Sequence, residues 1–153
     1  LRLKSFGVCM ENLNICSNEK LSFKYGDDWQ LDETPDDSNP DCIATLTYKD
    51  GSYFNVIAYQ SEWTSLEDFK EVVENSMIND GADIISSRIS KINGIPSIEI
   101  HSHINIPEIS FDMFSVIFIE DGFLIFFELR TISDLIGEFM KILETLEIKY
   151  DLE

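Results

Sequence analysis

The chain has 153 residues, which suits one domain that buries about 70% of the surface exposed by its unfolded form. Apolar residues make up 44% of it and aromatic residues 12%, so we expect a packed core and exclude a disordered chain. The formal net charge is −18, from 29 acidic and 11 basic residues. Such a charge repels nucleic-acid phosphates and anionic lipid headgroups, so we expect neither as a partner.

The cysteines and the chain ends leave the cellular compartment open. Cys9, Cys16 and Cys42 form no C-x-x-C pair, which argues against a zinc ribbon or a disulfide framework, while a Cys9 to Cys16 disulfide stays open. No apolar run reaches the roughly 18 residues that a membrane helix needs. The chain begins at Leu1 and ends in Leu152-Glu153, a pair that commonly remains before an affinity tag. Both a cell-envelope domain that has lost a leader or lipid anchor and a cytoplasmic domain fit, and the oligomeric state is open too.

The first part of the chain predicts short strands and turns. Residues 1–18 show no clean period, and we expect a peripheral helix or strand there. The alternation in residues 21–25 predicts a half-buried strand, followed by a turn and by Trp29 as an aromatic anchor. Residues 32–42 have the composition of an exposed loop. Residues 43–48 and 53–59 then predict a hairpin, because Asp-Gly between them is a strong turn signal.

One helix is predicted from Thr64 to about Met77. Thr64 and Glu67 have the spacing of a capping box, and apolar residues then recur every three or four positions. A glycine at the end of Asn79-Asp80-Gly81 is suited to close the helix.

The second half predicts a meander of four strands and a closing helix. Turn signals at Asn93-Gly94 and at 120–122 separate the strands. The expected strands are 83–92, 97–106, 111–119 and 123–130. The third and fourth are apolar on both alternating faces, which indicates central strands covered on both sides. An apolar stripe then predicts a helix from Leu135 to about Glu147, and 148–150 predicts a short edge strand.

These elements predict an α+β fold in a single domain spanning residues 1–153. We expect an antiparallel sheet of about six strands with helices packed on both faces, an α/β/α sandwich. Residues 152–153 are set aside from the fold as the expected tag remnant.

The layout resembles the PsbP-like group, which includes DcrB-like envelope lipoproteins and shares its fold with a Ran-binding nuclear import factor. The resemblance covers about the last 130 residues. It rests on LSFKYGDDW at 21–29, SLEDFKEVVENSM at 65–77, KINGIPSIEI at 91–100, FSVIFIEDGFLIFFELRT at 114–131 and FMKILETLEI at 139–148.

The sequence departs from the family pattern at Gly26, where Pro is usual, and at Thr145, where Ser is common. Within the group, the photosystem protein assists an oxygen-evolving complex and the import factor binds a GTPase. The resemblance therefore implies a non-enzymatic accessory or binding role, with no catalytic motif and no cofactor to carry over.

A possible metal site involves Glu99, His101 and His103. On a strand these three side chains project from one face, and imidazoles two residues apart can converge on a transition metal. Glu99 or an acid from a neighbouring strand would be the third ligand. The alternative is that both histidines simply lie on the exposed half of an antiparallel strand.

Other candidate chemistry is weaker. The acidic residues between 27 and 41 lack the ligand spacing of an EF-hand, so we interpret them as a solvated loop, with cation binding left open. Cys42 with His101 or His103 is the only cysteine and histidine pairing worth naming, and Ser102 faces away from both histidines. We therefore predict no enzymatic activity.

Aromatic residues near turns are the candidates for a protein-binding surface, namely Trp29, Tyr59 and Trp63, because Trp and Tyr are favoured at contact hot spots. Such residues also close the ends of cores. We predict a protein-binding or accessory module whose partner is another protein, with a metal-binding protein as the alternative.

Overall fold

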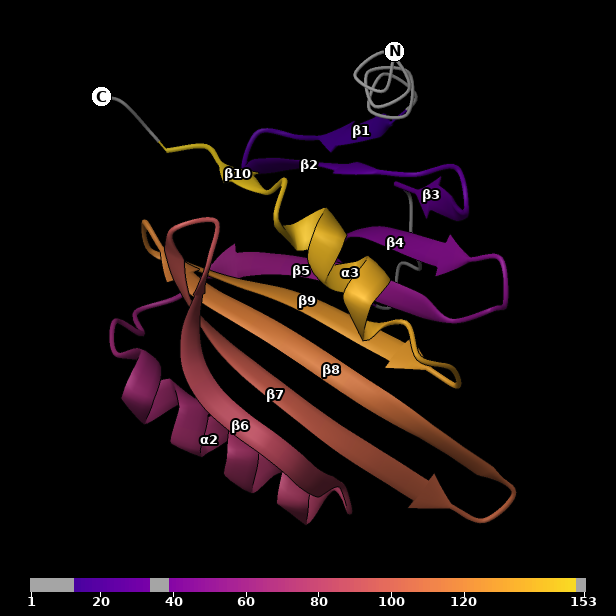
Figure 1. Cartoon of the computed structure of the whole chain (residues 1–153). Helices are drawn as coiled ribbons and strands as arrows, with labels where there is room; N and C mark the ends of the chain where they lie inside the picture. Colours follow the sequence, from indigo (N-terminus) through magenta and orange to yellow (C-terminus); the bar gives the residue numbers. More distant parts are fainter. Residues whose placement is uncertain (1–12, 34–38, 151–153) are drawn as a thin grey trace.

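The computed structural model describes residues 13–33 and 39–150, which form two antiparallel sheets and two helices (Figure 1). The larger sheet has seven strands, which lie in the order β3 (Trp29–Asp32), β4 (Cys42–Tyr48), β5 (Tyr53–Gln60), β9 (Phe123–Thr131), β8 (Ile109–Glu120), β7 (Ile95–Ile106) and β6 (Asp83–Ile92). The smaller sheet has three, which lie in the order β1 (Asn14–Ser17), β2 (Leu21–Tyr25) and β10 (Glu147–Ile148).

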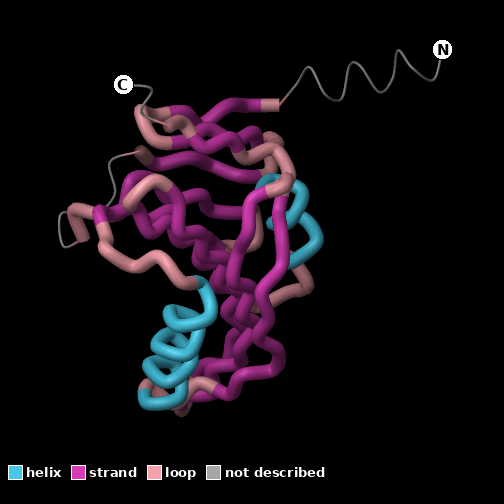
Figure 2. Tube along the Cα trace, turned by 90° about the vertical axis from the view of Figure 1, so that its left-hand side faces the viewer, coloured by secondary structure: helices cyan, strands magenta, loops and turns pink. Residues whose placement is uncertain are grey.

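The alternation of side chains along the central strands divides the core in two. Phe114, Val116 and Phe118 of β8 pack into a cluster with α3 (Ile136–Leu143) and the smaller sheet. Their neighbour Ile117 packs instead into a cluster below α2 (Leu66–Asn79). In Figure 2 the two helices lie on opposite sides of the strands.

The expected α/β/α sandwich of about six strands is not matched, although the α+β class is right. The described residues contain ten strands, and the face that holds α3 is covered largely by the three-stranded sheet. A helix of eight residues, about 12 Å long, is too short to cover that face alone.

The turns of the meander are those that the sequence predicts. Asn93 and Gly94 have φ angles of 52° and 80°, and Asp121 and Gly122 have 54° and 78°. Two successive positive φ angles are the mark of a type I′ turn, which Asn-Gly and Asp-Gly favour. These turns fix the register of β6 with β7 and of β8 with β9.

Both helices differ from prediction at one end. The N-cap of α2 is Ser65 rather than Thr64, because the Ser65 Oγ accepts a hydrogen bond from the Asp68 backbone N–H at 3.2 Å. Helix α3 ends at Leu143 instead of about Glu147. There Thr145 Oγ1 donates to the Ile142 carbonyl at 2.7 Å and accepts from the Lys24 backbone N–H at 2.7 Å, which turns the chain toward the smaller sheet.

Candidate functional site

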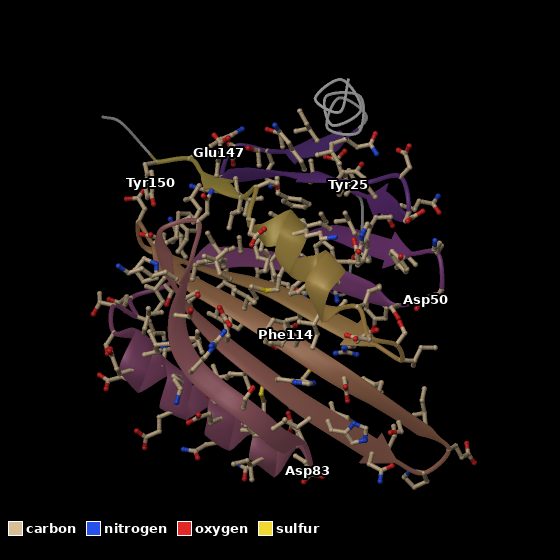
Figure 3. The ribbon with its side chains drawn as sticks, in the orientation of Figure 1. Tyr25, Asp50, Asp83, Phe114, Glu147 and Tyr150 are labelled. Atoms are coloured by element: carbon tan, nitrogen blue, oxygen red, sulfur yellow. The ribbon has the colours of Figure 1, made fainter. Side chains whose placement is uncertain are left out.

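The hairpin of β7 and β8 projects beyond the rest of the larger sheet (Figure 1). Pairing of β7 with β6 ends at His103, and pairing of β8 with β9 ends at Asp112. Within the described chain, residues 104–111 therefore pair only with each other, and we call them the arm. Figure 3 marks Asp83, the first residue of β6, which lies opposite His103 where the arm begins.

The arm has one apolar and one polar face. The cross-strand pairs Ile104 with Phe111 and Ile106 with Ile109 lie on one face, because opposed residues of antiparallel strands project to the same side. The pair Asn105 with Ser110 lies on the other. Ile106 and Ile109 are 49% and 51% exposed, so the apolar face is largely uncovered.

A groove of about 510 Å³ runs along the apolar face of the arm. It is lined by Tyr53, Ile106, Ile109, Phe111, Arg130 and Ile132, together with Asp50 and the turn beside it. Ile132 is 70% exposed. The described chain thus gathers three of its exposed large aliphatic side chains at one place.

Arg130 supplies the positive charge of the groove. Its Nη1 donates to the Tyr53 hydroxyl at 3.3 Å, and its guanidinium lies 6.0 Å from the centroid of the Tyr53 ring. No carboxylate of the described residues lies within ion-pair distance of Arg130. Asp50 is engaged elsewhere, since it accepts from the Ser133 hydroxyl at 2.6 Å and from the Ser52 N–H at 2.8 Å. These hydrogen bonds, the one from Ser133 first, lower the pKa of Asp50.

The polar side of the hairpin carries a chain of hydrogen bonds around Asp112. His103 Nδ1 lies 2.6 Å from Asp112 Oδ1, and His103 Nε2 lies 2.9 Å from the Ser110 Oγ. His101 Nε2 lies 3.4 Å from the second carboxylate oxygen of Asp112. The bond from His103 is the largest cause of a lowered Asp112 pKa.

The predicted metal ligands are only partly brought together. Glu99, His101 and His103 share a face, but Glu99 is buried and its Oε1 accepts from Arg88 Nε at 3.1 Å and Nη2 at 2.9 Å. Asp112 of β8 is the acid from a neighbouring strand, which the sequence could identify only through the register. In residues 13–33 and 39–150, no group of three or more His, Cys, Asp or Glu is arranged to hold a metal ion. Metal binding stays a prediction.

The three aromatic candidates do not form one surface. Trp29 is only 5% exposed and packs edge-on against Tyr48 at 4.9 Å, so it belongs to the core rather than to a contact surface. Tyr59 stacks on Phe126 near α2. Trp63, which is 38% exposed, lies against Phe69 on that side of the sheet as well. Sequence reasoning missed the groove because its residues come from three separated segments.

The nucleophiles named from the sequence are not next to a base. Cys42 Sγ lies 3.5 Å from the Ala44 carbonyl, and Ser102 is buried with no hydrogen-bond partner for its hydroxyl among the described residues. Cys16 is buried, which raises the pKa of its thiol to about 11. The prediction on Cys9 falls outside the described residues, as do those on 34–38 of the acidic loop and on residues 152–153.

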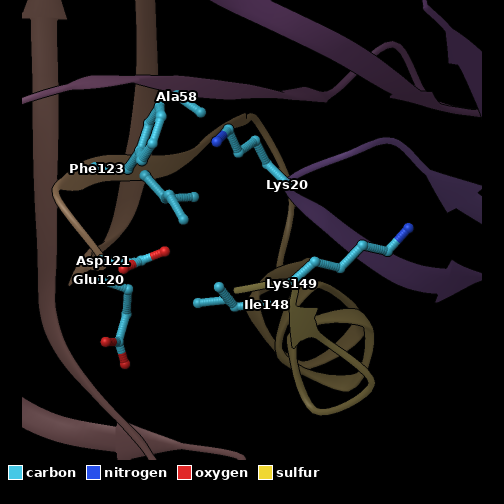
Figure 4. Close-up of a pocket in the computed structure, with 8 residues that line it drawn as sticks. Lys20, Ala58, Glu120, Asp121, Phe123, Ile148 and Lys149 are labelled. Atoms are coloured by element: carbon cyan, nitrogen blue, oxygen red, sulfur yellow. The ribbon is translucent and has the colours of Figure 1, made fainter. Parts of the chain in front are cut away.

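A second pocket lies at the seam between the two sheets (Figure 4). Its volume is about 10 Å³, enough for at most about one water molecule. The Lys20 ammonium lies 3.8 Å from the centroid of the Phe123 ring and closes it. The two sheets pack against each other at this seam, and the pocket is too small to be a ligand site.

Comparison with solved structures defines the class of fold as PsbP-like. Cyanobacterial PsbP from Synechocystis sp. PCC 6803 superimposes with a TM-score of 0.66 at 15% identity, covering 90% of this chain and 92% of PsbP. A Bacteroides thetaiotaomicron VPI-5482 protein gives a TM-score of 0.63 at 15% identity over 87% of this chain and 46% of that one. The predicted resemblance is therefore confirmed for the fold.

A third structure of the same fold is a Pseudomonas aeruginosa protein of unknown function, described as a candidate regulator. It has a TM-score of 0.51 and 12% identity, covering 88% of this chain and 95% of that one. No protein-family model and no curated protein sequence matches the chain. No helix in the described part of the chain is long and apolar enough to cross a membrane.

Proposed function

We propose that the chain is a non-enzymatic accessory module that binds a segment of another protein in the groove beside the arm. The observation that carries this proposal is the uncovered apolar face of the arm, where Ile106 and Ile109 project without a third strand. A PsbP-like fold and a candidate regulator among its structural neighbours support an accessory role.

The energetics favour a bound segment. Full burial of an isoleucine side chain contributes about 1.5 to 3 kcal/mol, so covering the exposed half of Ile106 or Ile109 contributes roughly 1 kcal/mol. Tyr53 and Arg130 add residue types that are enriched among interface hot spots. The groove thus combines apolar area with a directional polar group.

The Arg130 guanidinium defines the polar chemistry expected of the partner. The chain carries 29 acidic residues against 11 basic ones, yet the exposed cation of this groove forms no ion pair in the described structure. We infer a segment with aliphatic residues beside a carboxylate, which can form a bidentate pair with the Arg130 guanidinium.

The test compares the wild type with an Ile106→Asp/Ile109→Asp variant in native extract. Ile85→Asp is the matched control, since Ile85 is 58% exposed on β6, away from the groove. We expect the wild type and the control to capture the same partner. With that partner purified, the arm variant should raise the Kd at least about ten-fold.

A photo-crosslinking residue in place of Phe111 would identify the bound segment. We expect this segment to contain an acidic residue. Arg130→Gln should weaken binding only by removing the contact with that acidic residue. A partner that binds the arm variant as tightly as the wild type would overturn the proposal.

The alternative function is metal binding by His101 and His103. The observation behind this alternative is that the Asp112 carboxylate contacts both imidazoles, although the three groups as they stand are not arranged to hold a metal ion. Asp112 would have to release its hydrogen bonds first. Calorimetric titration with zinc, nickel and copper should show one ion per chain, lost in His101→Ala/His103→Ala. Failure to bind any of them would remove this alternative.

A further inference from the structure

We propose that Ser110 is a nucleophilic serine, activated by His103 and Asp112, that accepts an acyl group from an activated ester. The site lies on the polar side of the hairpin, opposite the groove, and Ser110 does not line the groove. The inference is therefore independent of the proposed binding function.

The hydrogen bonds fix the role of each member. An ionised carboxylate only accepts, so His103 Nδ1 carries the proton in the 2.6 Å bond to Asp112 Oδ1. In a neutral imidazole the other nitrogen is then an acceptor, and Nε2 receives the Ser110 hydroxyl at 2.9 Å. A serine hydroxyl that donates to a histidine oriented by a carboxylate is the arrangement that activates serine nucleophiles.

The strand register holds this arrangement in place. His103 is directly opposite Asp112, and Ser110 lies two residues from Asp112 on the same face of β8. The second oxygen of Asp112 faces His101 Nε2 at 3.4 Å, so the carboxylate is held from two sides.

The reaction balances without any further reagent. The Ser110 Oγ attacks the carbonyl carbon of the ester while His103 Nε2 takes the hydroxyl proton. The bond from the carbonyl carbon to the leaving oxygen then breaks, and His103 returns the proton to the leaving group. The products are an ester of Ser110 and a free alcohol.

We expect one acyl group per chain rather than turnover. Ser110 is exposed on an open sheet face, which holds neither an ester nor an attacking water molecule in a fixed orientation, so repeated acylation and hydrolysis should be slow. Ser133 differs from Ser110, because its hydroxyl donates straight to the Asp50 carboxylate at 2.6 Å. Ser133 is therefore a matched control, exposed and bonded to a carboxylate without a histidine between them.

The experiment treats the full chain with p-nitrophenyl acetate and maps the acetyl group by mass spectrometry. We expect acetylation of Ser110, none of Ser133, and the same result in Ser133→Ala. His103→Ala should lower the initial rate at Ser110 about 100-fold, the lower range for loss of a general base. Asp112→Asn should lower it at least about ten-fold.

Each other outcome decides against the proposal. Acetylation that avoids Ser110, or proceeds there equally fast in His103→Ala, would overturn it. Continued release of p-nitrophenol that requires Ser110 would overturn the limit of one acyl group per chain and the non-enzymatic function with it. Arg130→Gln, which acts on the groove alone, should leave the acetylation rate unchanged, so failure of either proposal shows separately.

Discussion

Strands β7 and β8 run through both the body of the larger sheet and the arm, and the two regions differ in what surrounds these strands. In the body, β8 lies between β7 and β9, and Val116, Ile117 and Phe118 are fully buried on alternating faces. In the arm, Ile106 and Ile109 keep about half of their surface exposed. Apolar residues form a core where each strand has a paired strand on both sides. They form a contact surface in the arm, where no third strand is present.

The largest expected difference between the regions is in packing. Phe54→Ala in the body should lower the free energy of unfolding by about 4 kcal/mol, because Phe54 is fully buried. Phe111→Ala in the arm should cost less than about 1 kcal/mol. Urea unfolding of both variants measures this, and equal losses would mean that the arm is part of the core.

The ion pair between exposed Arg88 and buried Glu99 gives the next effect. Arg88→Met leaves the Glu99 carboxylate buried without its two hydrogen bonds, which should cost about 2 kcal/mol. Arg88→Met/Glu99→Leu should recover most of that loss, because no unpaired charge remains. A double variant as unstable as Arg88→Met would show that packing, not the charge, determines the loss. Chemical denaturation of the three proteins is the measurement.

The turns of the two regions should respond in opposite directions. Gly94 closes β6 onto β7 with φ 80°, so Gly94→Ala should destabilise the fold by about 1 kcal/mol. Glu108 at the tip of the arm has φ 81°, which strains a residue with a Cβ atom. Glu108→Gly should therefore stabilise by up to about 0.5 kcal/mol. The Tm of each variant checks the sign.

The smallest effects, below about 1 kcal/mol each, concern two carboxylates. The hydrogen bond from His103 lowers the Asp112 pKa, so Asp112 adds stability above its unfolded pKa, and this stability is lost as pH falls through the folded pKa. Burial raises the Glu128 pKa, so its contribution is present at low pH and is lost as pH rises through the folded pKa.

At neutral pH, Asp112→Asn should therefore lower the urea midpoint and Glu128→Gln should raise it. Both differences should shrink toward about pH 3, where the carboxyl groups are protonated in the unfolded chain. A Glu128→Gln variant that is less stable than the wild type at neutral pH would contradict the assigned sign.

Local sequence signals predicted most of the fold. The four strands of the meander, the hairpin of β4 and β5 and helix α2 follow from alternation, turn chemistry and helical periodicity, all of which act over a few residues. The second sheet could not be predicted, because β10 and β2 meet across more than 120 residues of chain. The early end of α3 depends on the same long-range contact, through Lys24 and Thr145.

Less of the candidate site than of the fold could be predicted from the sequence. The shared face of His101 and His103 follows from strand periodicity, but their partner Asp112 depends on the register of β8. Arg88 forms an ion pair with Glu99, so Glu99 is not available as a metal ligand. This ion pair depends on the register of β6 with β7. The groove exists because β7 and β8 extend beyond their neighbours β6 and β9. No local sequence pattern shows where the pairing between two strands ends.

During biosynthesis, β10 can pair with β2 only after all strands of the larger sheet have been synthesised. The seven strands of the larger sheet are complete once residue 131 has emerged from the ribosome, whereas the smaller sheet needs residues 147 and 148 to pair with Leu21 and Ser22. Until then, the face of Phe54 and Phe127 lacks the cover of α3 and β10. Between these two points of synthesis the nascent chain exposes an aromatic surface, and we expect it to depend most on chaperones in that interval.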